Sequence, residues 1–86
     1  MSKKLYIGNL SFSTTEERLR EIFLPYGEIL SVTILRDKES GASKGFGFVC
    51  LNDENAAQKA IRVLSGREID GRKIRVSETE EKRGMR

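Results

Sequence analysis

Hydrophobic and polar positions alternate along four stretches of the chain and recur at helical spacing along two others. The alternation predicts strands at residues 4–9, 28–36, 44–51 and 72–77. Apolar side chains spaced i, i+3, i+4 and i+7 predict two helices between these strands. The first helix carries Leu19, Ile22, Phe23 and Tyr26, and the second carries Ala57, Ala60, Ile61 and Leu64.

Local signals mark where the two helices begin and end. Thr14 followed by Glu17 predicts a capping box, in which a hydroxyl and a carboxylate each satisfy a free amide of the first turn. Pro25 argues against a long continuation, because the residue before a proline is disfavoured in the helical region. Segment 52–54 (Asn-Asp-Glu) predicts the start of the second helix, and Gly66 predicts its end.

The resulting order of elements predicts an α+β fold, a ferredoxin-like β-α-β-β-α-β sandwich. Two right-handed β-α-β crossovers joined by a loop at residues 37–43 form a split β-α-β arrangement. We expect a four-stranded antiparallel sheet with the first and third strands at its centre and both helices on one face. Residues 67–71 are predicted to be a short connector. Residues 1–78 are expected to form this one domain, and 79–86 a short charged tail that frays.

Strand alternation places three aromatic side chains on the face of the sheet that the helices leave uncovered. The aliphatic residues between them must face the core, so Tyr6, Phe46 and Phe48 face outward. A register shifted by one residue would bury the rings but expose those aliphatic side chains instead. A ring left in water lacks the roughly 1.5–3 kcal/mol of stabilisation that its burial would contribute. Flat rings on an open sheet can instead stack on unpaired bases, at about 1–3 kcal/mol per base.

The other aromatic residues and the strand glycines are expected to serve packing. Phe12, Phe23 and Tyr26 fall outside the open face and are predicted to pack in the core or in loops. The glycines of the third strand do not open a helix, which argues against a dinucleotide-binding loop. They are expected to keep the sheet surface open to a close ligand.

The positive charge of the chain falls on the same face. The 86 residues include 16 Lys+Arg and 13 Asp+Glu, a net charge of +3, and the excess arises within segments 36–51 and 67–76. Alternation puts cations but no carboxylate on the open face, namely Lys4, Lys44, Lys73 and Arg75. Basic side chains beside aromatic rings are the pattern expected for binding a phosphate backbone that carries stackable bases. The candidates for base specificity are Asn9, Thr33, Leu35, Cys50 and Ser77.

Two segments that carry these residues resemble motifs of the RNA recognition motif family. Segment 44–51 (Lys-Gly-Phe-Gly-Phe-Val-Cys-Leu) resembles the family's eight-residue ribonucleoprotein motif. Segment 5–10 (Leu-Tyr-Ile-Gly-Asn-Leu) resembles its six-residue companion on the first strand. The resemblance extends over residues 3–77, and the chain is similar in size to small members with a single such domain.

The resemblance implies a role for each motif residue. Tyr6 and Phe48 would each stack on a base, Phe46 would pack against the sugars between them, and Lys44 would pair with a phosphate. The last position of the longer motif, usually aromatic, is Leu51 here. Because alternation turns Leu51 toward the helices, we expect this departure to alter the core and to leave the binding face intact.

Composition excludes several classes of function. The chain has no His and one Cys, so it can form neither a His-based triad nor a Cys/His zinc site nor an internal disulfide. No apolar run approaches the ~20 residues of a membrane-spanning helix. We therefore expect no enzyme activity, no cofactor, no metal and no membrane partner.

The sequence thus predicts a monomer that binds single-stranded RNA, with single-stranded DNA as an open alternative. A second alternative is a protein-interaction module that uses the same face. A third is that an extension of the chain or a protein partner covers this face. One free cysteine favours a reducing compartment. We expect a cytoplasmic location, or a nuclear one if the chain is a domain of a larger protein.

Overall fold

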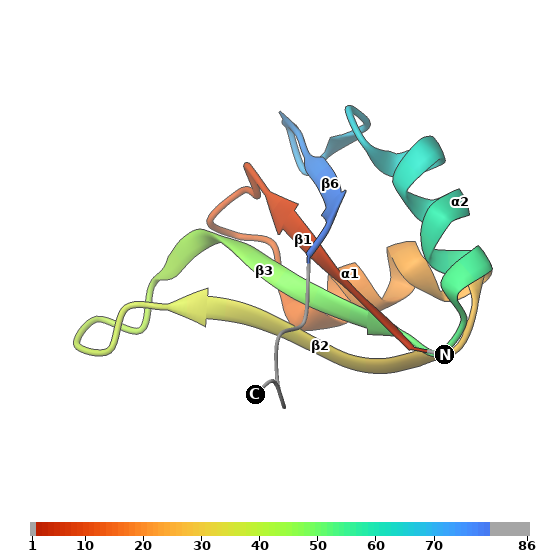
Figure 1. Ribbon diagram of the computed structural model, residues 1–86. Coiled ribbons are helices and arrows are strands. Elements are labelled where there is room, and N and C mark those ends of the chain that lie inside the picture. Colours follow the sequence, from red (N-terminus) through yellow and green to blue (C-terminus); the bar gives the residue numbers. More distant parts are fainter. Residues whose placement is uncertain (1, 80–86) are drawn as a thin grey trace.

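The four main strands pair in the order β2-β3-β1-β6, so β1 and β3 lie at the centre of the sheet (Figure 1). The computed structural model describes residues 2–79; the expected frayed tail therefore lies almost wholly outside the described residues. The strands are β1 (Lys3–Gly8), β2 (Ile29–Arg36), β3 (Ser43–Leu51) and β6 (Arg75–Glu78), and all neighbouring pairs are antiparallel. The predicted fold class is confirmed.

Two helices, α1 (Glu16–Phe23) and α2 (Glu54–Leu64), bury their apolar faces against one side of this sheet. Alternate strand residues supply the other half of the core. The most deeply buried side chains come from both layers, namely Leu5, Ile7, Val49 and Leu51 from the sheet and Leu19, Phe23, Ala57 and Ala60 from the helices. A strand shifted by one residue would move these aliphatic side chains into water, so core burial specifies the register.

The start of α1 differs from the expected capping box by one residue. Thr15 is the N-cap, and its hydroxyl accepts a hydrogen bond from the amide of Arg18 at 3.1 Å. Thr14 is buried, and its hydroxyl donates to Oδ2 of Asp70 at 2.8 Å. The predicted Thr14 cap is wrong because this hydroxyl is used in a tertiary contact. After Phe23 the chain tightens into a 3₁₀ turn, η1 (Leu24–Tyr26), so α1 ends near Pro25 as expected. The reason given for this end is wrong, because Leu24, the residue before the proline, keeps helical φ and ψ of −55° and −40°.

The segment predicted as a connector instead forms a small hairpin. Its strands are β4 (Glu68–Ile69) and β5 (Arg72–Lys73), joined by Asp70 and Gly71 with φ of 52° and 89°. Positive φ at both central residues is what a two-residue type I′ hairpin turn requires, and Asp-Gly is a preferred sequence for it. The predicted fourth strand is therefore wrong at its start, since residues 72 and 73 belong to the hairpin and not to the main sheet.

Glu16 connects the start of α1 to β2. Its carboxylate accepts hydrogen bonds from the amide of Ile34 at 3.3 Å and from Nη2 of Arg36 at 2.8 Å. Partial burial on its own would raise the pKa of Glu16. Hydrogen bonds from its own amide, from Arg36 and from Ile34, together with the charge of Arg36, outweigh burial and leave the pKa below the ordinary glutamate value.

We predict that the Glu16→Gln variant loses less of its free energy of unfolding than the wild type when the pH is lowered into the acid range. A lowered pKa in the folded state means that the carboxylate stabilises the fold above the ordinary glutamate pKa. This contribution is lost as the pH falls through the folded-state value. The pair is 40–41% exposed, so at neutral pH the variant should lose no more than about 1 kcal/mol. Denaturant unfolding at neutral and acid pH measures both chains, and a difference that does not shrink in acid would contradict this account.

Candidate nucleic-acid interface

Tyr6, Phe46 and Phe48 form one cluster, called the ring cluster below, on the face of the sheet opposite the helices. The ring centroids are 5.9 Å apart for Tyr6 and Phe46, and 6.1 Å apart for Tyr6 and Phe48. Phe46 and Phe48 are 6.4 Å apart with their planes 88° to one another. All three side chains are half-buried, since their edges pack together in the tilted and edge-on arrangements that aromatic pairs prefer. Part of each ring remains open to solvent.

Strand register holds the rings in place. Tyr6 on β1 is directly opposite Phe48 on β3. Thr33 on β2 lies on the other side of Phe48, and Ser77 on β6 lies on the other side of Tyr6. These four residues form one row across the whole sheet. Two small polar side chains therefore flank two rings. Neither is bulky enough to keep a flat ligand away from the rings.

Gly8 leaves the space that the ring of Tyr6 occupies. A Cβ at position 8 would lie 2.6 Å from the hydroxyl oxygen of Tyr6 and 2.7 Å from Cε2. Both distances are too short for real atoms. The phenol therefore leans along β1 over the backbone of Gly8. A side chain at this position would push the ring away from the surface it now covers.

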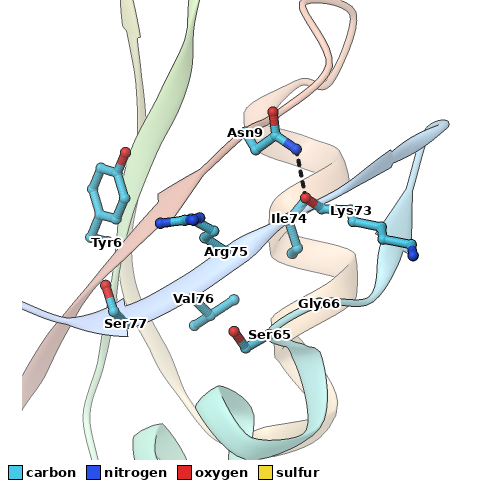
Figure 2. A pocket seen from close by; sticks show the side chains of 9 residues that line it. All are labelled: Tyr6, Asn9, Ser65, Gly66, Lys73, Ile74, Arg75, Val76 and Ser77. Atoms are coloured by element: carbon cyan, nitrogen blue, oxygen red, sulfur yellow. Dashed lines mark hydrogen bonds between the residues drawn. The ribbon is translucent and has the colours of Figure 1, made fainter.

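Three of the four predicted cations lie near the ring cluster. Nζ of Lys4 lies 4.7 Å from the centroid of the Phe48 ring, a cation–π distance. Lys44 is exposed two positions before Phe46 on β3. Arg75 lies opposite Gly8 on β6, and its guanidinium extends toward Tyr6 (Figure 2).

Lys73 is placed differently from its prediction. It lies in β5 of the hairpin, and its ammonium extends away from Tyr6 and Arg75 (Figure 2). Its backbone carbonyl accepts a hydrogen bond from the amide group of Asn9 at 2.7 Å. Lys73 and Tyr6 thus line one cavity, but the ammonium of Lys73 is turned away from the ring cluster.

Within residues 2–79, no carboxylate occupies an outward position in the four strands of the main sheet. The one acid in these four strands is Glu78, which lies one position beyond Ser77 and so on the helix side. There its carboxylate accepts from Gln58 of α2 at 2.6 Å and lies 3.4 Å from Nζ of Lys3. The outward positions of these four strands thus carry only positive and neutral side chains, which favours a negatively charged ligand.

A cavity of about 580 Å³ opens beside the ring cluster at the edge strand β6 (Figure 2). Tyr6, Arg75 and Ser77 line it on the open face, and Ser65 and Gly66 line it at the end of α2. The surface next to Tyr6 is therefore hollowed and carries two hydroxyls and a guanidinium. Groups of this kind can donate to the oxygen atoms of a polar ligand.

The remaining specificity candidates are one hydrogen-bonded residue, Asn9, and two half-buried residues, Leu35 and Cys50. Asn9 is engaged, because its Nδ2 donates to the Lys73 carbonyl while its Oδ1 accepts from Nη2 of Arg72 at 2.6 Å. It has φ of 57° and fastens the end of β1 to the hairpin. Cys50 and Leu35 are half-buried on the open face, as alternation predicts. Cys50 lies opposite Lys4 and Ser31.

Phe12 lies in a loop, as one of the two expectations had it, but it is far more exposed than a packed side chain. Phe23 is fully buried and Tyr26 packs against the core, as expected. Phe12, however, is 73% exposed in the loop between β1 and α1. Strand alternation gives no information there, since loop side chains follow no period.

Two other kinds of feature are absent from residues 2–79. Within residues 2–79, no three His, Cys, Asp or Glu side chains gather as metal ligands would. Among the described residues, neither helix has the length and apolar character needed to cross a membrane.

Comparisons with known proteins agree with this geometry. The sequence profile of the family described as RNA recognition motif matches residues 5–75. The mitochondrial glycine-rich RNA-binding protein 4 of Arabidopsis thaliana is 43% identical over 77 residues, which are 90% of this chain and 57% of that protein. The chain therefore spans little more than half the length of this curated relative.

Two solved structures are similar over almost the whole chain. RNA-binding protein PG1 superposes with a TM-score of 0.89 at 42% identity, covering 92% of this chain and 95% of that one. The Sxl-lethal protein/RNA complex superposes with a TM-score of 0.88 at 30% identity, covering 94% of this chain and 48% of that one.

We predict that Gly8→Ala displaces the Tyr6 ring without unfolding the sheet. The added methyl meets only the far end of a side chain that can rotate. The free energy of unfolding should therefore change by less than about 1 kcal/mol. Loss of nuclear Overhauser contacts between Tyr6 and Phe46 would report the displacement.

Gly47→Ala is the matched control. A Cβ at position 47 would collide with the backbone carbonyl oxygen of Thr33 on β2, and backbone cannot rotate away. This variant should lose about 1–3 kcal/mol of stability. Unchanged Tyr6–Phe46 contacts in Gly8→Ala, or equal stability losses in the two variants, would contradict the account.

Proposed function

The chain belongs to the RNA recognition motif family, and on this premise we propose that it binds single-stranded RNA across the open face without catalysing a reaction. The observation that supports this most strongly is the ring cluster, three half-buried aromatic side chains held side by side on an uncovered sheet. Single-stranded RNA is recognised by splaying its bases out and stacking them on such rings.

Each ring takes the role that its position allows. Tyr6 and Phe48 lie opposite one another on the two central strands and each receive a base. Phe46, which contacts both of the other rings, packs against the sugars between those bases. Lys44 and Arg75 neutralise phosphates. Lys73 is left out of this set because its ammonium extends away from the rings.

Lys4 changes partner when RNA binds. In the free protein its ammonium lies over Phe48, the ring that we assign to a base. A cation–π contact at an exposed site contributes about 0.5–1 kcal/mol, whereas a base stacked on an aromatic ring contributes about 1–3 kcal/mol. The base therefore displaces the ammonium from the ring. The released Lys4 then lies beside the incoming nucleotide and pairs with a phosphate.

The proposal also includes a location and an oligomeric state. The chain is proposed to act as a monomer in the cytoplasm or, as a domain of a longer protein, in the nucleus. Relatives carry mitochondrial and chloroplastic names, so organelles are a further setting to test. Sedimentation velocity and cell fractionation measure these two properties.

We predict that the Phe46→Ala/Phe48→Ala double variant binds RNA at least about tenfold more weakly. One lost stack alone costs about 1–3 kcal/mol, and 1.4 kcal/mol is tenfold in affinity. Fluorescence anisotropy with labelled RNA of random sequence measures the dissociation constant. Leu24→Ala is the control, because it removes an exposed apolar side chain (60% exposed) from η1. Equal affinity of wild type and a folded double variant would refute binding across the ring cluster.

We also predict that Lys44→Ala reduces the salt dependence of binding. The slope of log affinity against log salt concentration should fall in magnitude by about 0.7, the value for one phosphate contact on a single strand. Lys59→Ala changes the net charge equally, but Lys59 lies exposed on α2. The proposal would fail for Lys44 if both variants had the same slope.

A further inference from the structure

Phe12 is an exposed aromatic ring that the proposed interface does not yet use. Within residues 2–79, three large hydrophobic side chains are exposed, and Phe12 at 73% exceeds Leu24 and Leu30 at 60% and 50%. Phe12 is the aromatic one of the three. A single exposed hydrophobic residue is common in proteins, so exposure alone assigns no role. Two further observations bear on this ring.

The loop that carries Phe12 is anchored by a buried, hydrogen-bonded residue on each side of the ring. On one side Leu10 is buried, and its amide donates to the carbonyl of Gly45 at 2.8 Å. On the other side the buried Thr14 donates to Asp70, and its amide donates to the carbonyl of Ser11 at 3.0 Å. The ring is therefore presented to solvent by a loop whose ends are fixed. A side chain already held in place loses less entropy when it binds a ligand.

The ring of Phe12 also lies against β3, beside two residues of the proposed interface. A Cβ at Gly45 would lie 3.2 Å from Cε1 of Phe12, so the ring lies against the backbone of β3 at this point. Gly45 stands between Lys44 and Phe46, a proposed phosphate contact and a member of the ring cluster. Gly45 has φ of 84°, a conformation that favours glycine. Phe12 thus lies next to the segment of β3 that joins Lys44 to Phe46.

From this placement we infer that Phe12 is a further base-stacking residue. It receives one unpaired base beyond those on the ring cluster, and Lys44 lies beside the phosphate of the nucleotide that joins them. This inference rests on the proposed RNA binding and adds a nucleotide to its footprint. Stacking on a ring is tolerant of base identity, so the added nucleotide raises affinity more than sequence selectivity.

A tryptophan at this position tests the inference directly. The chain has no Trp, so Phe12→Trp introduces one indole as the sole fluorescent reporter of its kind. A base that stacks on the indole will quench or shift its emission when RNA of random sequence is added. Leu24→Trp is the control, since it places an indole at another exposed site, on η1. RNA binding itself is followed in parallel by anisotropy of a labelled RNA.

The outcomes separate the two proposals. RNA binding with a changed emission in Phe12→Trp and none in Leu24→Trp supports the inference. RNA binding with no emission change in Phe12→Trp overturns the inference and leaves the proposed function standing. The absence of any RNA binding by the wild-type chain overturns both. An emission change in both variants indicates nonspecific quenching and also overturns the inference.

Affinity measurements give a second test that does not depend on fluorescence. Phe12→Leu keeps an apolar side chain but removes the flat ring. It should weaken binding about fivefold or more, the lower end of the range for a lost base stack, while Phe12→Trp should bind at least as well as wild type. This loss of affinity should appear only with RNAs long enough to occupy the ring cluster and to reach Phe12 as well. Equal affinities of Phe12→Leu and wild type at every RNA length would contradict the role.

Discussion

The pairing of β1 with β3, which sets Tyr6 opposite Phe48, is the constraint on which the rest of the structure depends. Side chains on a strand alternate between two faces, so one register decides both faces at once. The buried aliphatic residues on these strands stabilise that register from the helix side. The aromatic rings appear on the other face as its direct consequence. Core stability and the binding surface therefore come from the same hydrogen-bonded ladder.

The open face is suited to a flat anionic ligand as much by what it lacks as by what it carries. Gly8 lacks the Cβ that would displace Tyr6. The one acid in the four main strands within residues 2–79, Glu78, contacts Gln58 and Lys3 on the helix side. The ammonium of Lys4 lies over the Phe48 ring, where the proposed base would replace it. The missing Cβ of Gly8 thus leaves room for a ring, and the position of Glu78 keeps negative charge away from the open face.

Sequence patterns predicted the layers, the sheet order and the exposed rings, because each follows from local periodicity and burial. They failed where a tertiary contact decides the outcome. Thr14 has the residue type of a cap, but Asp70 of the distant hairpin takes its hydroxyl. The hairpin was missed although Asp70-Gly71 is a strong turn signal, since two-residue strands show too little alternation to be recognised. The placement of Lys73 and Phe12 could not be predicted, because neither lies in a long strand.

The central claim is that RNA bases stack on the ring cluster, and the chemical shifts of the aromatic protons test it most directly. Phe23 of α1 is an internal reference because it is fully buried in the core between the helices and the sheet. On addition of single-stranded RNA, the ring protons of Tyr6, Phe46 and Phe48 should shift upfield through the ring currents of stacked bases, while those of Phe23 stay in place. Saturating RNA that leaves the three rings unshifted, or that shifts Phe23 equally, would contradict the account.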